Sequence, residues 1–266
     1  EVLQLLDEVQ KINPSDKGVL TLKAAYFLSK NQKQQALDAI YALRKIAPEN
    51  PLSYRVEAEV YKNEKDWLRA QSAYVRAYKL SPTSKGLFNI VDLMMVQNNS
   101  AEALVLLNRE LKKQGTKKLD IYFKIASINQ KLGDLDEAIR FYMLILEQQP
   151  KFVPVLNNLA MLYLENNNAK ALTYAKQAYE LKPNSGDIND TYGLVLVRQG
   201  YVSKGVKTLE NAVQLHPKNS LIRYHLAEAY VKNQEKEKAI IVLEVLSKEL
   251  SFSGQIAAQQ LLNSLR

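Results

Sequence analysis

The sequence predicts an all-α fold, a right-handed α-α superhelix built from repeated helical hairpins. The first observation is a proline that returns at a nearly constant interval, with one interval of double length. A period of about 34 residues is typical of helical-hairpin arrays. The second observation is a hydrophobic content of 47% with only nine glycines, which argues against disorder and against a turn-rich sheet. The prolines are Pro14, Pro48, Pro82, Pro150, Pro183 and Pro217.

The prolines divide the chain into seven predicted hairpins, each with a first and a second amphipathic helix. Proline ends each second helix because it cannot continue the helical hydrogen-bond ladder. Residues 1–16 match a second helix without its first helix, so we expect further repeats to precede Glu1. Residues 253–266 are predicted to form a capping helix with one apolar and one polar side. The seven hairpins are expected at residues 17–50, 51–84, 85–118, 119–152, 153–185, 186–219 and 220–252.

Small residues recur at one position of each helix type. Helices that cross within about 8–10 Å need a short side chain where they are closest. Trp67, the only tryptophan, is predicted to pack against a hairpin turn rather than to bind a ligand. The first helices carry Ala24, Ala58, Ala126, Ala160, Gly193 and Ala227 at this position. The second helices carry Ala36, Ala70, Ala103, Ala138, Ala171 and Ala239.

The fourth hairpin has the clearest local pattern. Its turn and second helix resemble those of the tetratricopeptide repeat family. The resemblance rests on the run Leu132-Gly133-Asp134-Leu135-Asp136-Glu137-Ala138-Ile139, followed by Tyr142 and Pro150. The resemblance covers nearly the whole chain and implies a tetratricopeptide solenoid whose first helices line a ligand groove. The third hairpin departs from the pattern, with Gly115 where proline is expected.

A narrower resemblance involves the fifth to seventh hairpins. These hairpins look like the C-terminal repeats of the bacterial lipoprotein family associated with exopolysaccharide loci and PEP-CTERM/exosortase sorting. The resemblance implies a full-length protein that is membrane-anchored and periplasmic; without it, a cytoplasmic protein is expected. It rests on Leu156-Asn157-Asn158-Leu159-Ala160, Ala171-Leu172-Thr173-Tyr174-Ala175, Asp190-Thr191-Tyr192-Gly193 and Arg223-Tyr224-His225-Leu226-Ala227.

The sequence indicates neither catalysis nor a cofactor. Cysteine is absent, which excludes disulfides and thiolate chemistry. The two histidines, His216 and His225, have no histidine four residues away, so we expect no metal site. No glycine-rich phosphate loop is present. We therefore expect a protein that is not an enzyme.

The formal net charge of +8 is concentrated in the first half of the chain. Residues 1–133 hold 21 Lys and Arg against 14 Asp and Glu, whereas residues 134–266 hold 15 against 14. One interpretation is an anionic partner such as polysaccharide, RNA or lipid headgroups. The other is a set of lysines that complement a helix C-terminus. The densest basic patch comprises Lys112, Lys113, Lys117, Lys118 and Lys124.

The predicted protein-binding residues lie on the first helices of the last three hairpins. Aliphatic side chains bordered by amides and carboxylates suit an extended segment or an amphipathic helix. The alternative is that these side chains only pack against neighbouring helices. The candidates are Asn157, Asn158, Met161, Leu164, Asp190, Leu194, Val197, Tyr224, His225, Glu228 and Val231.

These observations favour a non-catalytic scaffold that binds a protein partner in its concave groove. The narrower resemblance implies a role in exopolysaccharide export or assembly at the bacterial cell envelope. Anionic-polymer binding by the basic first half is the alternative function. Self-association through exposed edges of the array is a third possibility.

Overall fold

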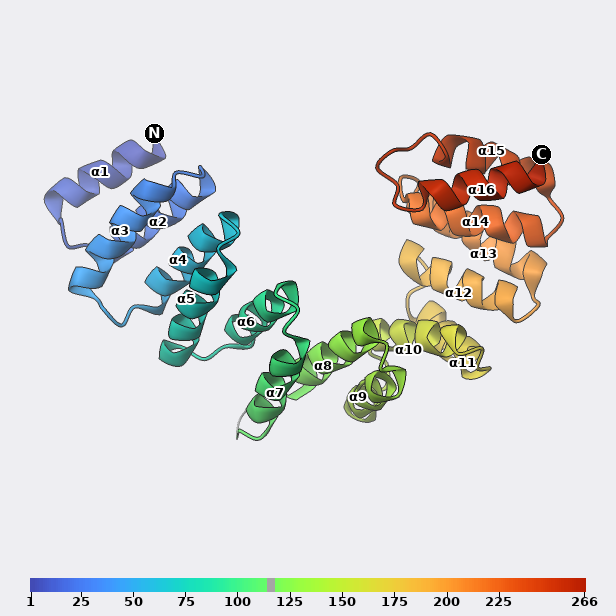
Figure 1. Cartoon of the computed structure of the whole chain (residues 1–266), viewed down its shortest axis with the longest axis horizontal. Coiled ribbons are helices and arrows are strands. Elements are labelled where there is room, and N and C mark those ends of the chain that lie inside the picture. The colour runs from blue at the N-terminus through green and yellow to red at the C-terminus, as the bar shows by residue number, and fades with distance from the viewer. Residues whose placement is uncertain (114–117) are drawn as a thin grey trace. The chain divides into compact units, whose positions relative to one another are not determined.

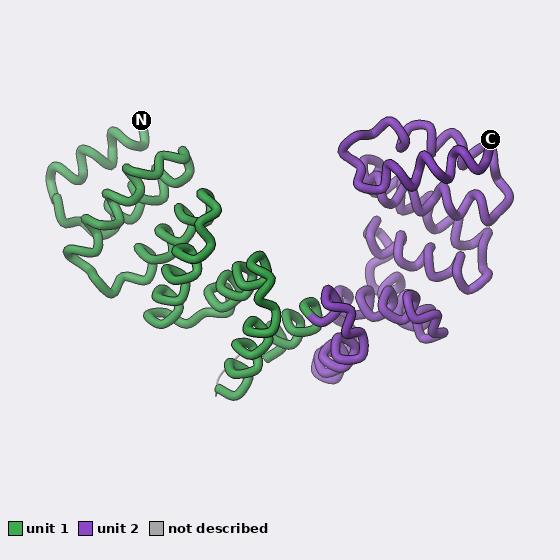
Figure 2. Tube along the Cα trace, in the orientation of Figure 1, with its two compact units in different colours: residues 1–128 green, residues 129–266 purple. Residues whose placement is uncertain are grey.

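The structure is a computed structural model that describes residues 1–113 and 118–266 (Figure 1). Gly115 and Lys117 lie outside these residues. The described residues form helices and no strands, which confirms the all-α prediction. They divide into two compact units, residues 1–128 and residues 129–266 (Figure 2).

Unit 1 contains one single helix followed by three successive hairpins and the start of the next. The single helix α1 packs against α2, and the hairpin pairs are α2 with α3, α4 with α5, and α6 with α7. Its helices are α1 (Val2–Ile12), α2 (Lys17–Ser29), α3 (Lys33–Ile46), α4 (Pro51–Asn63), α5 (Trp67–Leu80), α6 (Ser84–Val96), α7 (Ser100–Leu111) and most of α8 (Lys118–Leu132).

Unit 2 continues with the same helix-to-helix order. Within it, α10 packs against α11, α12 against α13, α14 against α15, and α16 covers α15. Its helices after α8 are α9 (Leu135–Gln148), α10 (Val153–Glu165), α11 (Lys170–Leu181), α12 (Gly186–Arg198), α13 (Val202–Leu215), α14 (Ser220–Lys232), α15 (Lys236–Leu246) and α16 (Gln255–Leu265).

Each described hairpin turn contains one residue with a positive φ angle. Glycine and asparagine adopt this left-handed conformation most readily. Five of the seven positions carry one of these two residues, and Lys65 and Gln234 are the exceptions. The seven residues are Asn31, Lys65, Asn98, Gly133, Asn167, Gly200 and Gln234.

The small residues mark the closest helix contacts, as predicted. Eleven of the twelve are alanines that are no more than 1% exposed. The twelfth is Gly193, where a Cβ atom would lie 2.6 Å from Leu209 Cγ. Trp67 packs against a buried cluster that includes Ala70 and Tyr74, as predicted.

Side-chain caps begin several first helices. Asn50 accepts a hydrogen bond from the Leu52 amide at 2.9 Å, and Pro51 occupies the first helical position. Asn219 caps α14 in the same way. Both caps follow from the residues that the sequence places after each stopping proline.

Candidate functional site

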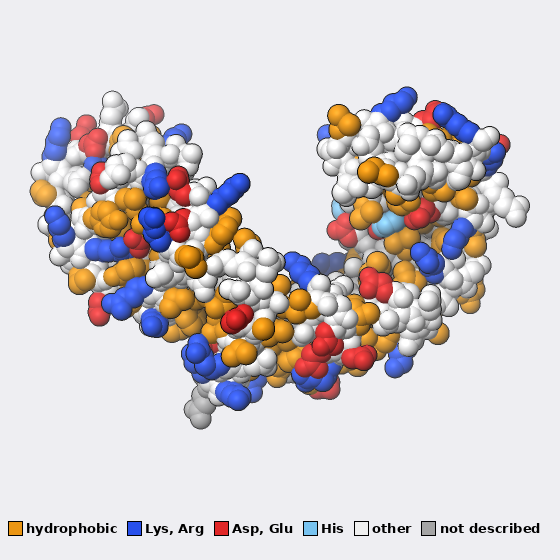
Figure 3. All heavy atoms as spheres, in the orientation of Figure 1, with side chains coloured by type: hydrophobic (Ala, Val, Ile, Leu, Met, Phe, Trp, Pro, Cys, Tyr) orange, Lys and Arg blue, Asp and Glu red, His pale blue; other side chains and the backbone are white. Residues whose placement is uncertain are grey.

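The first helices of unit 2 form a continuous surface. In it, α10 contacts α12, and α12 contacts α14. We call this surface the first-helix face of unit 2. It carries all eleven residues that the sequence suggests for protein binding: four on α10, three on α12 and four on α14. Figure 3 shows histidine, acidic and apolar side chains close together on this unit.

A hydrogen-bonded contact joins Asp190 of α12 to His225 of α14. His225 Nδ1 lies 2.8 and 3.0 Å from the two carboxylate oxygens of Asp190. The His225 and Asp190 side chains are 17% and 13% exposed. When Nδ1–H donates to the carboxylate, Nε2 becomes the acceptor of the neutral ring. The contact therefore fixes the imidazole and links two successive first helices.

Tyr224 and Glu228 form a second polar pair on α14. Burial raises the pKa of the Tyr224 hydroxyl, and the charge of Glu228 and a hydrogen bond to it raise that pKa further. The hydroxyl is therefore protonated near neutral pH and is bonded to the carboxylate. Both acidic side chains of the face, Asp190 and Glu228, consequently have a partner within the protein.

The two asparagines of α10 differ in their bonding. Asn158 donates its side-chain amide to the Tyr142 hydroxyl at 2.8 Å. Asn157 Oδ1 is buried and has no hydrogen-bond partner among the described residues. A buried acceptor without a donor costs about 1–3 kcal/mol. Of the two, Asn157 has the unsatisfied acceptor, and its burial keeps that atom out of reach of a segment on the surface.

The apolar candidates divide into half-buried and core residues. Met161, Leu164, Leu194 and Val231 are half-buried and keep some surface for a partner. Val197 is only 7% exposed and belongs to a core cluster of unit 2. The structure thus places Val197 beneath the face, where it supports the other residues.

The basic patch is partly neutralised within unit 1. Lys113 Nζ lies 2.6 Å from a carboxylate oxygen of Glu110, and Lys124 pairs with Asp92. Lys112 and Lys118 are exposed. Lys117 lies outside the described residues. Half of the four described lysines therefore have an acidic partner.

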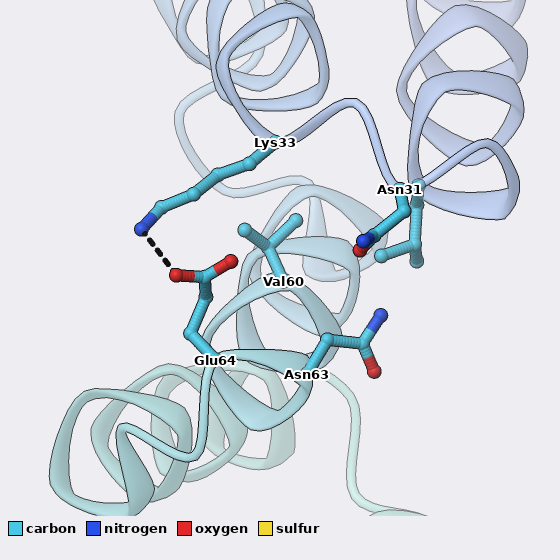
Figure 4. Close-up of a pocket in the computed structure, with 6 residues that line it drawn as sticks. Asn31, Lys33, Val60, Asn63 and Glu64 are labelled. Atoms are coloured by element: carbon cyan, nitrogen blue, oxygen red, sulfur yellow. Dashed lines mark hydrogen bonds and ion pairs between the residues drawn. The ribbon is translucent and has the colours of Figure 1, made fainter.

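A small pocket lies between α2, α3 and α4 in unit 1 (Figure 4). Lys33 Nζ lies 3.1 Å from Glu64 Oε2 at its border. The cavity volume of about 10 Å³ leaves room for one water molecule at most. This pocket is therefore too small to bind an organic ligand.

Neither a metal centre nor a membrane span is found in the described part of the chain. The described residues contain no cluster of three or more His, Cys, Asp or Glu side chains arranged to hold a metal ion. Among residues 1–113 and 118–266, no helix combines the length and apolar character needed to cross a bilayer.

Two segments match the tetratricopeptide repeat family: residues 119–152 and residues 196–265. A tetratricopeptide repeat protein from Parabacteroides merdae has a similar structure, with a TM-score of 0.67 and 16% identity over 94% of this chain and 98% of that chain. The C-terminal part of a repeat-containing protein from Cytophaga hutchinsonii gives 0.63 and 18% identity over 90% and 98%. The chain has the tetratricopeptide-repeat fold.

A longer chain of this fold is also similar. It comes from the crystal structure of the APC/C hetero-tetramer Cut9–Hcn1, with a TM-score of 0.65 and 14% identity. The match covers 99% of this chain and 52% of that chain, so this chain spans about half of its length. At these identities the likeness shows the fold alone. A comparison with curated proteins finds no matching sequence.

Sequence reasoning missed the partners of several site residues. Asp190 and His225 are both candidates, but their contact spans 35 positions and has no local signal. Tyr142, which binds Asn158, was considered only as part of the repeat pattern. A search for polar residues at matching positions of successive first helices could have found the Asp190–His225 pair.

Proposed function

We propose that the first-helix face of unit 2 binds a segment of a partner protein and that the chain acts as a non-catalytic scaffold. The observation that carries this proposal is the mixture on one continuous surface of half-buried aliphatic side chains and internally fixed polar groups. The aliphatic side chains supply apolar area, and polar groups held in place give directional contacts at little entropic cost.

The chemistry of this face favours a segment that brings hydrogen-bond donors. Asn157 Oδ1 and, in the neutral ring, His225 Nε2 are acceptors without an assigned partner. A backbone N–H group of an extended segment would satisfy His225 Nε2, whereas Asn157 Oδ1 is buried beneath the surface. Leu194 and Met161 would then contact the aliphatic side chains of the segment.

We further propose a setting in the bacterial cell envelope, in exopolysaccharide export or assembly. The support is the resemblance of the fifth to seventh hairpins to exosortase-associated repeat lipoproteins. In that setting the full-length protein is anchored to the membrane and faces the periplasm. Expression of the full-length gene product with an epitope tag, followed by fractionation, tests the location. Recovery in the cytoplasmic fraction would contradict it.

Peptide display on the purified chain tests the binding face. Selected peptides should bind the wild type and should lose at least about 10-fold in affinity with Leu194→Asp, because the carboxylate replaces half-buried apolar area. Leu250→Asp is the matched control, since Leu250 is 89% exposed and lies outside the face. Equal affinity of the selected peptides for both variants and the wild type would refute the proposed face.

Binding of an anionic polymer through the predicted basic patch is the weaker candidate. The ion pairs of Lys113 and Lys124 with Glu110 and Asp92 reduce the charge that the patch presents. Any anion-binding role must therefore depend on other cations in unit 1.

A further inference from the structure

A lysine recurs near the end of every complete second helix in unit 1. Lys11, Lys45, Lys79 and Lys113 follow one another at the repeat period of about 34 residues. The first three are the penultimate residues of α1, α3 and α5, and Lys113 follows the end of α7. All four are exposed; Lys113 is paired with Glu110, so Lys11, Lys45 and Lys79 are the rungs on which the proposal depends. We call these four residues the lysine ladder.

Unit 2 shows that the helices do not require lysine at this position. Glu147 and Glu180 are the penultimate residues of α9 and α11, and Gln214 is that of α13. Lysine returns after α15, because Lys248 follows that helix by two residues as Lys113 follows α7. A lysine in the last turn complements the helix dipole by about 0.3–1 kcal/mol, whereas a glutamate opposes it. The helices α9 and α11 form with the unfavourable residue. Helix stability alone therefore does not explain the ladder.

Other cations reinforce the ladder along the same edge of unit 1. Second helices end and first helices begin at this edge, which adds the exposed Lys17 and Lys85 at the starts of α2 and α6. Arg76 and Lys112 are also exposed near the ends of α5 and α7. On the border where α3, α5 and α7 end, Figure 3 shows blue side chains gathered. Carboxylates at this edge, among them Asp16, Glu49, Glu110 and Asp120, offset part of this charge.

The spacing of the ladder suits a long ligand. The first helices α2 and α4 are in contact, so successive hairpins are stacked one helix layer apart. Packed helices lie roughly 8–10 Å apart. The Debye length at physiological ionic strength is also about 8 Å. A polymer that follows the edge can contact the rungs of successive hairpins one after another.

We propose that the lysine ladder binds a linear anionic polysaccharide with carboxylates along its chain. Lysine presents a compact point charge that pairs with a carboxylate or a phosphate, so the charges alone indicate only an anionic polymer. The positions one turn before the rungs are Asp7, Tyr41, Val75 and Arg109. Nucleic-acid bases need a series of aromatic platforms, and only one of these four residues is aromatic. This activity belongs to unit 1 and does not depend on the proposed peptide-binding face.

Binding of alginate, a polyuronate, to the full chain tests the proposal. The measurement is the dissociation constant between about 50 and 200 mM NaCl, where charge-driven binding should fall steeply. The double variant Lys45→Gln/Lys79→Gln should weaken binding at least about 10-fold and reduce the salt slope by about one for each lysine. The control Lys207→Gln/Lys232→Gln removes the same net charge from exposed positions in unit 2 that lie away from the ends of the second helices, and should change affinity less than about 2-fold.

Four results would overturn the proposal. Equal weakening by the two double variants would show a net-charge effect without a site. Absence of alginate binding at about 50 mM NaCl would remove the ligand class. Tighter binding of a thymidine oligonucleotide than of alginate would assign the ladder to nucleic acid, and binding only to phosphatidylserine vesicles would assign it to a membrane surface. Thermal unfolding of each variant confirms that the exposed substitutions leave the helices intact.

Discussion

The two units of this chain share a backbone plan and differ in the chemistry of their surfaces. Unit 1 holds 20 Lys and Arg against 14 Asp and Glu, a formal charge of +6, while unit 2 holds 16 against 14, a charge of +2. Unit 1 has lysine near the ends of its second helices, where unit 2 has Glu147, Glu180 and Gln214. Unit 2 instead presents the Asp190–His225 pair among half-buried aliphatic residues.

The comparison shows that the repeat restricts which residues can occupy the buried helix contacts, whereas the residue type at exposed positions can vary. Small residues occupy the helix contacts in both units, because packing allows nothing larger there. Exposed positions at the same register change from cation to anion without loss of the helix. Two different binding roles can therefore occupy one architecture, each in its own unit.

The largest expected effect concerns the closest helix contact of unit 2. A Cβ atom on Gly205 would lie 2.5 Å from Val197 Cγ2 and 2.9 Å from the Gly193 carbonyl oxygen. Gly205→Ala should lower the free energy of unfolding by about 3 kcal/mol, because backbone and core side chains must move apart. Urea unfolding measures the loss.

The matching position in unit 1 is the control for this contact. Ala70 is fully buried, and Ala70→Gly should cost only about 1 kcal/mol through helix propensity. A smaller loss of stability for Gly205→Ala than for Ala70→Gly would contradict the claim that the helix contact at Gly205 has no room for a Cβ atom.

A second prediction compares tyrosine–glutamate pairs in the two units. The Tyr78 hydroxyl donates to Glu110 at 2.8 Å, and Tyr230 donates to Glu210 at the same distance. Glu110 is 2% exposed, whereas Glu210 is half-buried. Tyr78→Phe should therefore cost about 1–2 kcal/mol and Tyr230→Phe less, since Glu110 loses a buried donor and keeps Lys113, whereas water can replace the lost donor at Glu210.

The alkaline limb of stability provides an independent check on the Tyr78 pair. Burial raises the pKa of Tyr78 to about 12, and its bond to Glu110 contributes to the shift. The stabilisation is complete below the unfolded-state pKa of about 10 and is lost as pH rises towards 12. Tyr78→Phe should remove this part of the alkaline decline. An unchanged decline between pH 10 and 12 would contradict the assignment.

A third prediction concerns the turns. Lys65 has a φ of 60°, a conformation that costs an ordinary L-residue roughly 1–2 kcal/mol. Lys65→Gly should stabilise unit 1 by about 1 kcal/mol. Lys207→Gly, at an exposed position in the middle of α13, should destabilise unit 2 by a similar amount. Melting temperatures that shift in the same direction for both variants would contradict this explanation.

The smallest expected effect is a pH dependence in unit 2. A hydrogen bond from the Ser220 hydroxyl, followed by the contact with Arg223, lowers the pKa of Glu249. The resulting stability is complete above the unfolded-state pKa near 4.5 and is lost as pH falls through the lower folded-state pKa. Glu249→Gln should therefore reduce the difference in melting temperature between pH 6 and pH 3. If the wild type and Glu249→Gln show the same difference in melting temperature between pH 6 and pH 3, the Glu249 carboxylate does not contribute to the pH dependence of stability.

Much of the fold could be predicted because the same pattern of small, apolar and helix-capping residues recurs in each repeat. Ala58 and Ala70 could be placed in the core because the same register carries a small residue in other hairpins. Asn50 and Pro51 predicted the start of α4 through local rules alone. These features depend on neighbours within a few residues, which a single sequence displays.

The candidate site was less predictable because its contacts join different repeats. The hydrogen bond between Asp190 and His225 joins side chains on two different helices, α12 and α14, and no local sequence pattern indicates it. Val197 has the spacing of a surface residue, yet the close approach of Gly193 and Gly205 buries it.

The residues with positive φ angles also carry a consequence for how the chain can change in length. Each of them follows the previous one at nearly the same interval along the chain. Two intervals, from Lys65 to Asn98 and from Asn167 to Gly200, are one residue short, and the interval from Asn98 to Gly133 is one residue long, so every turn stays within one residue of a regular period. The hairpins therefore tolerate a change of one residue without loss of the repeat. Gene duplication or deletion can add or remove a whole repeat without changing the register of the helices in the other repeats.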